Sequence, residues 1–253
     1  MRIILSIISL VLISSCQYND KPIVPGICIS FDDRSIKDWY DMKDMLKEYD
    51  ATATFFITQF DSLEDNEIEM LKALEKDGHE IGFHGAKHVY AEYYIKENSY
   101  SSYLKDEIDE GLQSMRLAGF VCRSFAYPFG STYWFTDYLL LKRFDFVRSV
   151  ASLGKEDDLK SIDDIFYSGD NTGAVSAIGI DGGSGVTSAM IEGGLKRAKQ
   201  NGEVLMLYGH QPVVSNKPEP YQFSIHLLRQ ILEQSKQYDL KFYTFQELNE
   251  KVN

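Results

Sequence analysis

The run Pro25-Gly26-Ile27-Cys28-Ile29-Ser30-Phe31-Asp32-Asp33 decides the fold class of this chain. A Pro-Gly turn signal is followed by a short apolar run, which is typical of a buried strand. Two carboxylates come directly after that strand. The same order, an apolar strand and then polar residues, recurs further along the chain, so the run also indicates where functional side chains gather.

Strand-like and helix-like segments alternate about seven times along the chain. Strands are expected at 25–31, 51–58, 79–83, 120–126, 144–150, 203–208 and 240–243. Helices are expected at 38–50, 66–77, 101–117, 133–143, 184–200, 221–238 and 244–252, and an apolar run at 174–180 lies in a segment that is harder to assign. Such alternation predicts parallel βα units wound into one sheet or barrel. Since no linker-like stretch divides it, residues 25–253 are expected to form one domain.

Composition and charge exclude some classes of function. The chain has 253 residues, of which 44% are hydrophobic and 25% charged, and its formal net charge is −12. Binding to a nucleic-acid backbone needs clustered Lys and Arg, so no nucleic-acid partner is expected. A neutral or cationic substrate fits this charge better. Cys28 and Cys122 lie in apolar, strand-like segments without metal-site spacing, and we expect two buried free thiols.

The amino terminus has the pattern of an export signal. Met1-Arg2 supplies one positive charge, 3–13 is almost wholly apolar, and Ser14-Ser15-Cys16 follows. The apolar run is too short to span a bilayer. Its ending resembles a bacterial lipobox, which predicts a lipoprotein signal at 1–16, lipid on Cys16 and a tether at 17–24. The expected location is the bacterial cell envelope, lipid-anchored at the outer membrane or a periplasmic face, and the sequence leaves the side open. A plain secretory signal or a buried strand are the alternatives.

Polar residues follow four of the expected strands at the point where each ends: Asp32-Asp33, His84 and His88, Tyr127-Pro128, and His210. The carboxyl ends of parallel strands share one face, where active sites of βα folds lie. These four groups, which are far apart in sequence, are therefore expected to meet on one rim.

The residue types on that rim suit metal-assisted hydrolysis. Two histidines four residues apart, His84 and His88, can reach one metal. One added carboxylate makes a three-ligand site that leaves positions open for water, as in catalytic zinc centres. Such a metal activates water and polarises a carbonyl. A second carboxylate then serves as general base, and a histidine across the pocket as general acid.

Four segments together resemble the NodB-homology or polysaccharide deacetylase family, carbohydrate esterase family four. They are Ser30-Phe31-Asp32-Asp33, the segment from Gly78 to His88, Tyr127-Pro128-Phe129-Gly130, and Leu207-Tyr208-Gly209-His210. The resemblance runs from about residue 25 to the carboxyl terminus. It implies a distorted (β/α)7 barrel that removes acetyl groups from N- or O-acetylated sugars.

The resemblance also implies a role for each matching residue. Asp32 is the implied base and His210 the implied acid. Asp33, His84 and His88 are the implied ligands of a divalent metal, zinc first, with cobalt or nickel accepted by the same set. The segment Tyr127-Pro128-Phe129 would wall the groove, with the Phe129 backbone N–H at the oxyanion, and Leu207 would line an acetyl pocket.

Three departures from the family pattern stand out. Gly85 replaces the usual Ser or Thr after the first metal histidine, and Ala126 replaces an Arg two residues before Pro128. The Asp-containing motif that orients the acid histidine is not recognisable. The candidate replacements for the missing charges are Arg123 and Arg148 on the basic side, and Asp164, Asp170 and Asp181 on the acidic side.

These departures keep other functions open beside a metal-dependent deacetylase. One is a glycan-binding lipoprotein that has the same barrel but impaired catalysis. Another is an amide hydrolase acting on a substrate other than a sugar. An acetylated glycan and, through Cys16, a membrane are the expected partners.

Overall fold

The computed structural model describes residues 23–154, 158–169 and 172–249. The expected signal segment and residues 17–22 of the expected tether lie outside these ranges, so the lipobox prediction at Cys16 is not addressed by them. In the described ranges no helix is long and apolar enough to cross a membrane.

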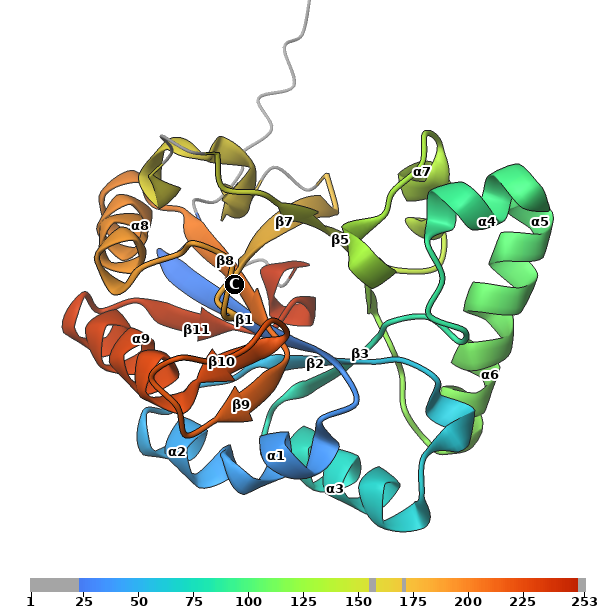
Figure 1. Ribbon diagram of the computed structural model, residues 1–253, viewed down its shortest axis with the longest axis horizontal. Coiled ribbons are helices and arrows are strands. Elements are labelled where there is room, and N and C mark those ends of the chain that lie inside the picture. Colours follow the sequence, from blue (N-terminus) through green and yellow to red (C-terminus); the bar gives the residue numbers. More distant parts are fainter. Residues whose placement is uncertain (1–22, 155–157, 170–171, 250–253) are drawn as a thin grey trace, which may run out of the picture.

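Seven parallel strands form a closed barrel (Figure 1). They pair in the order β1 (Gly26–Asp33), β2 (Thr54–Ile57), β3 (Glu80–Phe83), β4 (Ser124–Ala126), β5 (Phe146–Ala151), β7 (Ala174–Gly179) and β8 (Val204–Gly209). The last strand pairs back onto the first, from Gly26↔Val204 to Phe31↔Gly209. The predicted (β/α)7 barrel is confirmed.

Two short strands distort the barrel. β11 (Lys241–Tyr243) pairs with the first half of β1, whereas β2 pairs with its second half. Because β8 occupies the other edge of β1, β11 and β2 share one edge, and the sheet opens between them. β6 (Phe166–Tyr167) pairs in antiparallel fashion with the start of β8, whereas β7 pairs with the later residues of β8. The distortion therefore lies toward the amino ends of the strands, away from the predicted rim.

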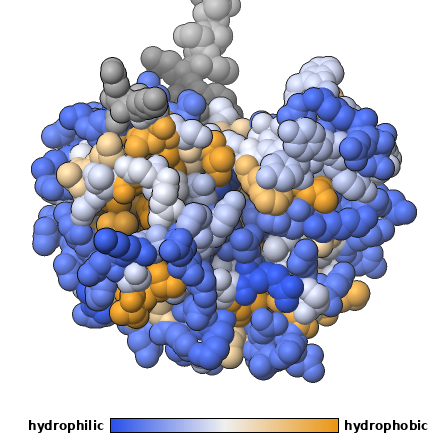
Figure 2. Space-filling model, viewed as in Figure 1, coloured by the Kyte–Doolittle hydropathy of each residue, from blue (hydrophilic) through white to orange (hydrophobic). Residues whose placement is uncertain are grey.

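Helices surround the barrel, and most follow a strand as the alternation predicts (Figure 1). They are α1 (Ile36–Asp41), α2 (Lys43–Glu48), α3 (Asp65–Lys76), α4 (Ala91–Glu97), α5 (Tyr100–Tyr103), α6 (Glu110–Leu117), α7 (Thr136–Leu140), α8 (Ser188–Asn201) and α9 (Ile225–Gln237). Between β5 and β7 the described residues form short 3₁₀ turns, η4 (Leu159–Ser161) and η5 (Asp163–Ile165), in place of a helix. The face in Figure 2 is mostly hydrophilic, in keeping with the net charge of −12.

Two apolar layers build the core because side chains alternate across each strand. One layer fills the barrel interior and includes Cys28, Phe56, Phe146 and Met206. A larger layer packs between the outside of the barrel and the helices. Both cysteines are free thiols, as expected. Cys28 is buried as expected, whereas Cys122 is only half-buried.

Several element boundaries differ from those predicted. The helix expected at 38–50 is two helices that meet at Met42, whose ψ of 0° interrupts the helical turn. The helix expected at 101–117 contains a π-helical turn, η2 (Leu104–Asp109). The helix expected at 221–238 begins later, because Gln222–Ser224 form β10, which pairs with β9 (Gln211–Val213). The closing helix is a 3₁₀ turn, η6 (Gln246–Asn249), within the described chain.

Candidate metal centre and active site

A cavity of about 480 Å³ opens at the carboxyl ends of the barrel strands. Its walls come from six separate segments of the chain. The lining residues are Asp32, Asp33, His84, His88, Tyr90, Phe129, Gly130, Val150, Tyr208, His210 and Tyr221. Asp32, Asp33, His84, His88 and His210, which were expected on one rim, thus meet in one pocket, whereas Tyr127 and Pro128 do not line it.

Asp33, His84 and His88 present ligand atoms that all lie within 4.8 Å of one another. Asp33 Oδ1 is 3.4 Å from His84 Nε2 and 3.1 Å from His88 Nε2. Burial works to raise the pKa of Asp33, but its hydrogen bonds to the two histidines outweigh burial and hold that pKa well below its usual range. The carboxylate is therefore ionised at neutral pH.

The orientation of His84 leaves the correct nitrogen for a metal. Its Nδ1 lies 2.8 Å from the carbonyl oxygen of Ala126, and a carbonyl can only accept. Nδ1 must therefore carry a proton, and Nε2 is the ring nitrogen that faces Asp33 and His88 and would give up its own proton to bind a metal. Such a backbone contact on the far ring nitrogen is the usual support of a metal-ligating histidine.

Four residues that line the pocket hold backbone conformations that favour glycine. The φ angles are +85° at Asp33, +59° at His88, +58° at Phe129 and +62° at Tyr221. Left-handed φ at non-glycine residues is uncommon and gathers at functional sites, where the surrounding structure enforces it. This clustering supports a functional role for the pocket independently of its side-chain chemistry.

Asp32 forms a buried ion pair with Arg148 of β5. The Asp32 residue is 3% exposed and Arg148 is 0% exposed, and the guanidinium donates to Asp32 Oδ2. The guanidinium carbon also lies 4.7 Å from the ring centroid of Tyr208 and 5.5 Å from that of Phe56. Asp32 Oδ1 is buried without a hydrogen-bond partner. One carboxylate oxygen is thus anchored, and the other is available to a reacting group.

His210 is held by Asp181 from both its backbone and its ring. Its N–H donates to Asp181 Oδ1 at 3.0 Å, and its Nδ1 lies 2.6 Å from Asp181 Oδ2. Trp39 Nε1 donates to the His210 carbonyl at 2.7 Å. Burial acts to lower the pKa of His210, but the hydrogen bond to Asp181 and nearby carboxylate charges, including Asp32, raise it above its ordinary value. The ring is suited to carry a proton.

Comparison with known proteins agrees with this geometry. The profile described as Polysaccharide deacetylase matches residues 20–143, which include the Asp32-Asp33 and His84 to His88 segments. Over these residues the chain is similar to the polysaccharide deacetylase family. Family and fold together support a carbohydrate deacetylase, a hydrolase that acts on acetyl groups. No curated protein matches the chain.

Solved structures of polysaccharide deacetylases share the fold at low sequence identity. A family 4 acetyl xylan esterase from Clostridium thermocellum in complex with a cobalt ion is 18% identical, with a TM-score of 0.53, covering 88% of this chain and 89% of that one. The peptidoglycan N-acetylglucosamine deacetylase catalytic domain from Eubacterium rectale is 17% identical, with a TM-score of 0.52 and coverage of 87% and 88%. A carbohydrate esterase family 4 (CE4) esterase from Streptococcus mutans is 18% identical, with a TM-score of 0.56, covering 87% of this chain and 86% of that one.

Two departures from the polysaccharide deacetylase pattern are filled from elsewhere in the fold. Ala126 lies directly opposite Arg148 in the β4–β5 register, so the arginine has moved to the neighbouring strand. Asp181, which follows β7, lies beside His210, the histidine implied as the acid. Of the other candidates, Arg123 pairs with Asp145 at 2.5 Å and is not brought to the pocket. Asp164 lies at a different cavity, and Asp170 is outside the described residues.

The residues predicted to bind substrate are only partly brought to the pocket. Phe129 lines it and is 43% exposed, whereas Leu207 is 1% exposed and packs between barrel and helices. Tyr127 is 1% exposed and donates from its hydroxyl to Asp137 Oδ1 at 2.6 Å, and Pro128 is buried. Tyr208 takes the pocket position next to Leu207. Strand alternation was the available signal, since neighbours in β8 must face opposite sides.

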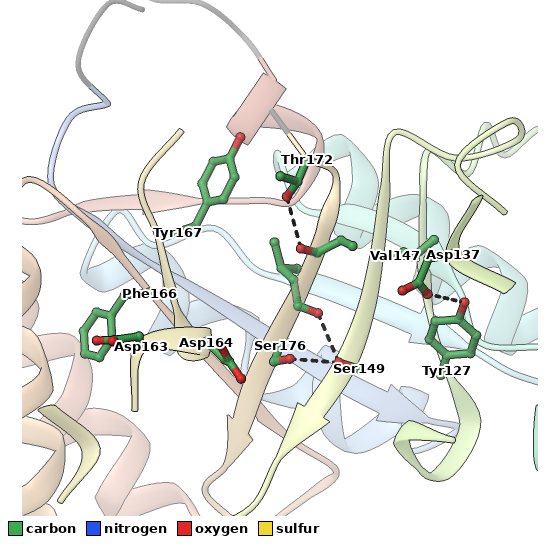
Figure 3. Close-up of a pocket in the computed structure, with 12 residues that line it drawn as sticks. Tyr127, Asp137, Val147, Ser149, Asp163, Asp164, Phe166, Tyr167, Thr172 and Ser176 are labelled. Atoms are coloured by element: carbon green, nitrogen blue, oxygen red, sulfur yellow. Dashed lines mark hydrogen bonds between the residues drawn. The ribbon is translucent and has the colours of Figure 1, made fainter. Parts of the chain in front are cut away.

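A second cavity, of about 350 Å³, lies between β5, β7 and η5 (Figure 3). Several of its polar groups have hydrogen-bond or ion-pair partners. Ser149 Oγ lies 2.8 Å from Ser176 Oγ, and Asp163 pairs with Arg197 at 2.7 Å. Among the described residues the only cluster of potential metal ligands is Asp33, His84 and His88. The second cavity therefore lacks the chemistry found in the first.

Replacing Asp181 with Asn is expected to move the alkaline limb of the pH–rate profile to lower pH. Asp181 raises the pKa of His210, so the protonated imidazole survives to higher pH while the carboxylate is present. Without it the proton is lost earlier as pH rises, and kcat falls by roughly tenfold or more. Activity measured against pH checks this, and an alkaline limb that stays in place or rises would contradict it.

Proposed function

We propose that this chain is a metal-dependent hydrolase that removes acetyl groups from N- or O-acetylated carbohydrate. One observation carries the proposal. A single pocket combines the Asp33–His84–His88 cluster with two supported proton-transfer groups, Asp32 on Arg148 and His210 on Asp181. General acid–base hydrolysis needs these parts on either side of a reacting carbonyl.

The donor set fits a divalent metal. Asp33 Oδ1 is buried and has no hydrogen-bond donor beside it other than the imidazole nitrogens. Two imidazole nitrogens and one carboxylate oxygen are the donors found in catalytic zinc sites, where a fourth position stays open. We propose zinc, with cobalt or nickel as functional substitutes. When bound, such an ion acts as a Lewis acid and eases deprotonation of water.

The chain's own residues supply the proton transfers. Asp32 Oδ1, which is unpartnered, takes the proton of the attacking water, while Arg148 fixes Oδ2 and compensates the charge. His210 Nε2 lies 3.9 Å from Asp33 Oδ2, across the pocket, and gives its proton to the leaving amine or alcohol. Asp181 stabilises the protonated form of His210 and holds the orientation of its ring. The Phe129 backbone N–H is proposed to stabilise the oxyanion.

Aromatic rings beside the pocket favour a sugar substrate. Phe129 and Tyr90 stack with ring centroids 3.9 Å apart and an interplanar angle of 4°, and both line the pocket. Tyr93, which is 62% exposed, continues the row next to Tyr90. Flat exposed rings of this kind offer large, rigid apolar faces with little entropy cost. With the net charge of −12, they fit a neutral or cationic glycan.

The site of action is proposed from the amino terminus alone. The lipobox-like ending at Cys16 supports a lipid-anchored protein of the bacterial cell envelope. Mass spectrometry of the full chain expressed in bacteria is expected to find lipid on an amino-terminal Cys16, and an unmodified Met1 would reject the anchor.

Chelation is the direct test of the proposed function. The soluble segment from residue 17 onward is expected to hold one divalent metal per chain and to release acetate from acetylated chito- or xylo-oligosaccharides. Metal removal should abolish release, and zinc should restore it. Metal without turnover of any acetylated substrate would point instead to a glycan-binding protein. Full activity in the metal-free protein would reject metal dependence.

A further inference from the structure

The longest helical stretch among the described residues is interrupted by a π-helical turn. α5 leads into η2 (Leu104–Asp109), which leads into α6. π-Helical turns are rare, and an extra residue in the turn changes the direction of side chains and releases backbone groups from the helical ladder. Glu107 lies within this turn and is 0% exposed, so its carboxylate points into the protein.

Glu107 accepts three hydrogen bonds from the backbone of the segment 85–89, which carries His88. Its carbonyl oxygen accepts from Ala86 N at 2.9 Å. Its carboxylate accepts from Lys87 N at 2.6 Å and from Val89 N at 3.1 Å. These two N–H groups stand on either side of His88, so the carboxylate spans the ligand from one peptide to the next.

Gly85 leaves the space that this carboxylate occupies. Its φ is +88°, and a Cβ atom built at Gly85 would lie 2.1 Å from Glu107 Oε1. On this backbone, a Ser or Thr at position 85, the usual family residue, would require the Glu107 carboxylate to move away. The first departure from the family pattern is thus matched to a buried acceptor that holds the same segment.

Burying the Glu107 carboxylate costs folding free energy unless hydrogen bonds compensate for the lost water. Burial raises the pKa of this carboxyl to about 7, and the backbone donors at Lys87 and Val89 oppose the rise. Among the salt bridges of the described residues none includes Glu107 as an ion-pair partner. A buried carboxylate needs good hydrogen bonds to be tolerated. Those it has all lead to the segment that places His88 at φ +59°.

We propose that Glu107 is a positioning residue that fixes the segment from Gly85 to Val89 so that His88 Nε2 stays within ligand distance of Asp33 and His84. The inference rests on the metal site of the proposed function. It extends the site to a residue 19 positions from His88 in sequence, on a different element. Groups that orient metal ligands in this way usually affect metal affinity by about 10–100-fold.

The test compares Glu107→Gln with a matched control, Glu80→Gln. Gln keeps the shape of Glu but presents an NH₂ group to one of the two backbone donors, so one hydrogen bond is lost. Glu80 is also a buried carboxyl, but it accepts from Thr54, Ser124 and the backbone N–H of Gln246 inside the barrel. Both changes therefore disturb a buried carboxyl, and only one of them touches the segment that carries His88.

Metal affinity, measured by zinc competition with a chromogenic chelator, is the first readout. Glu107→Gln is expected to bind zinc about 10–100-fold more weakly than the unchanged chain. Glu80→Gln should remain within about threefold even if its melting temperature falls. Amide hydrogen exchange at Lys87 and Val89 is expected to accelerate in Glu107→Gln alone. In the cobalt-loaded protein the visible spectrum should change with Glu107→Gln and not with Glu80→Gln.

The outcomes separate this inference from the proposed function. Zinc affinity and amide exchange unchanged in Glu107→Gln would overturn the positioning role while leaving the metal site intact. An unchanged chain that binds no metal would instead reject the proposed function. If Glu107→Gln does not fold, Glu107→Asp keeps the charge but is too short to reach both donors. The same loss of affinity is then expected, and wild-type affinity would overturn the role.

Discussion

Asp32→Asn is expected to keep its metal and to lose deacetylation by about a thousandfold, within the range that general acid–base groups contribute. The amide oxygen can still accept from Arg148, so the side chain stays in place, but Asn cannot take a proton from water. Metal retention follows because Asp33, His84 and His88 are unchanged. Metal analysis and acetate release on one preparation measure both effects.

Asp33→Ala is the matched comparison for that variant. It removes the neighbouring carboxylate, the one that lies against both histidines, and is expected to lose metal and activity together. Metal content alone would then distinguish the roles of the two adjacent aspartates. Equal metal loss in both variants would contradict the division of roles, and a fully active Asp32→Asn would exclude Asp32 as the base.

Arg148→Ala is expected to lower both activity and stability. Asp32 would remain 3% exposed and charged with its cation removed. Breaking a buried ion pair from one side typically costs about 3–5 kcal/mol in the free energy of unfolding. The carboxylate of Asp32, the proposed general base, would also lose the contact that orients it, and kcat should fall by about a hundredfold. Urea denaturation and steady-state kinetics measure the two losses.

Returning the arginine to the family position is expected to reverse part of that loss. Ala126 stands opposite Arg148 in the β4–β5 register, and both side chains face the barrel interior. In the double variant Ala126→Arg with Arg148→Ala, the new guanidinium can enter the space vacated by the old one. At least a tenfold recovery over Arg148→Ala is expected. Ala126→Arg alone should instead destabilise through overpacking. No recovery would show that Asp32 requires its partner on β5.

The arginine exchange shows how a site can keep its chemistry while a motif changes. What Asp32 needs is a guanidinium inside the barrel beside its carboxylate, and a neighbouring strand can supply it. Asp181 and Glu107 illustrate the same principle at His210 and at the segment carrying His88. The departures that kept a catalytically impaired protein open are each matched by a residue with suitable chemistry, which favours the active enzyme among the hypotheses.

The sequence pattern was enough to predict a parallel sheet or barrel and its rim, and the family resemblance implied the barrel. Apolar runs that end in polar residues mark parallel strands, and the carboxyl ends of parallel strands must share one face. Asp32, Asp33, His84, His88 and His210 could therefore be placed together before their distances were known. The candidate partners Arg148 and Asp181 were also named, since each is a charged residue at or just after a strand.

Only the tertiary structure decided which partner each group takes. Arg123 and Arg148 are both charged residues near strands, but strand register and side-chain alternation direct Arg148 to Asp32 and leave Arg123 with Asp145. Tyr208 lines the pocket where Leu207 was expected, for the same reason. Glu107 carried no signal, because a π-helical turn is not visible in a periodicity of 3.6 residues. The sequence determines which residues reach the rim, because the hydrophobic pattern that marks the strands is local. Which residues then pair depends on strand register and side-chain packing, and these are set by segments far apart in the sequence.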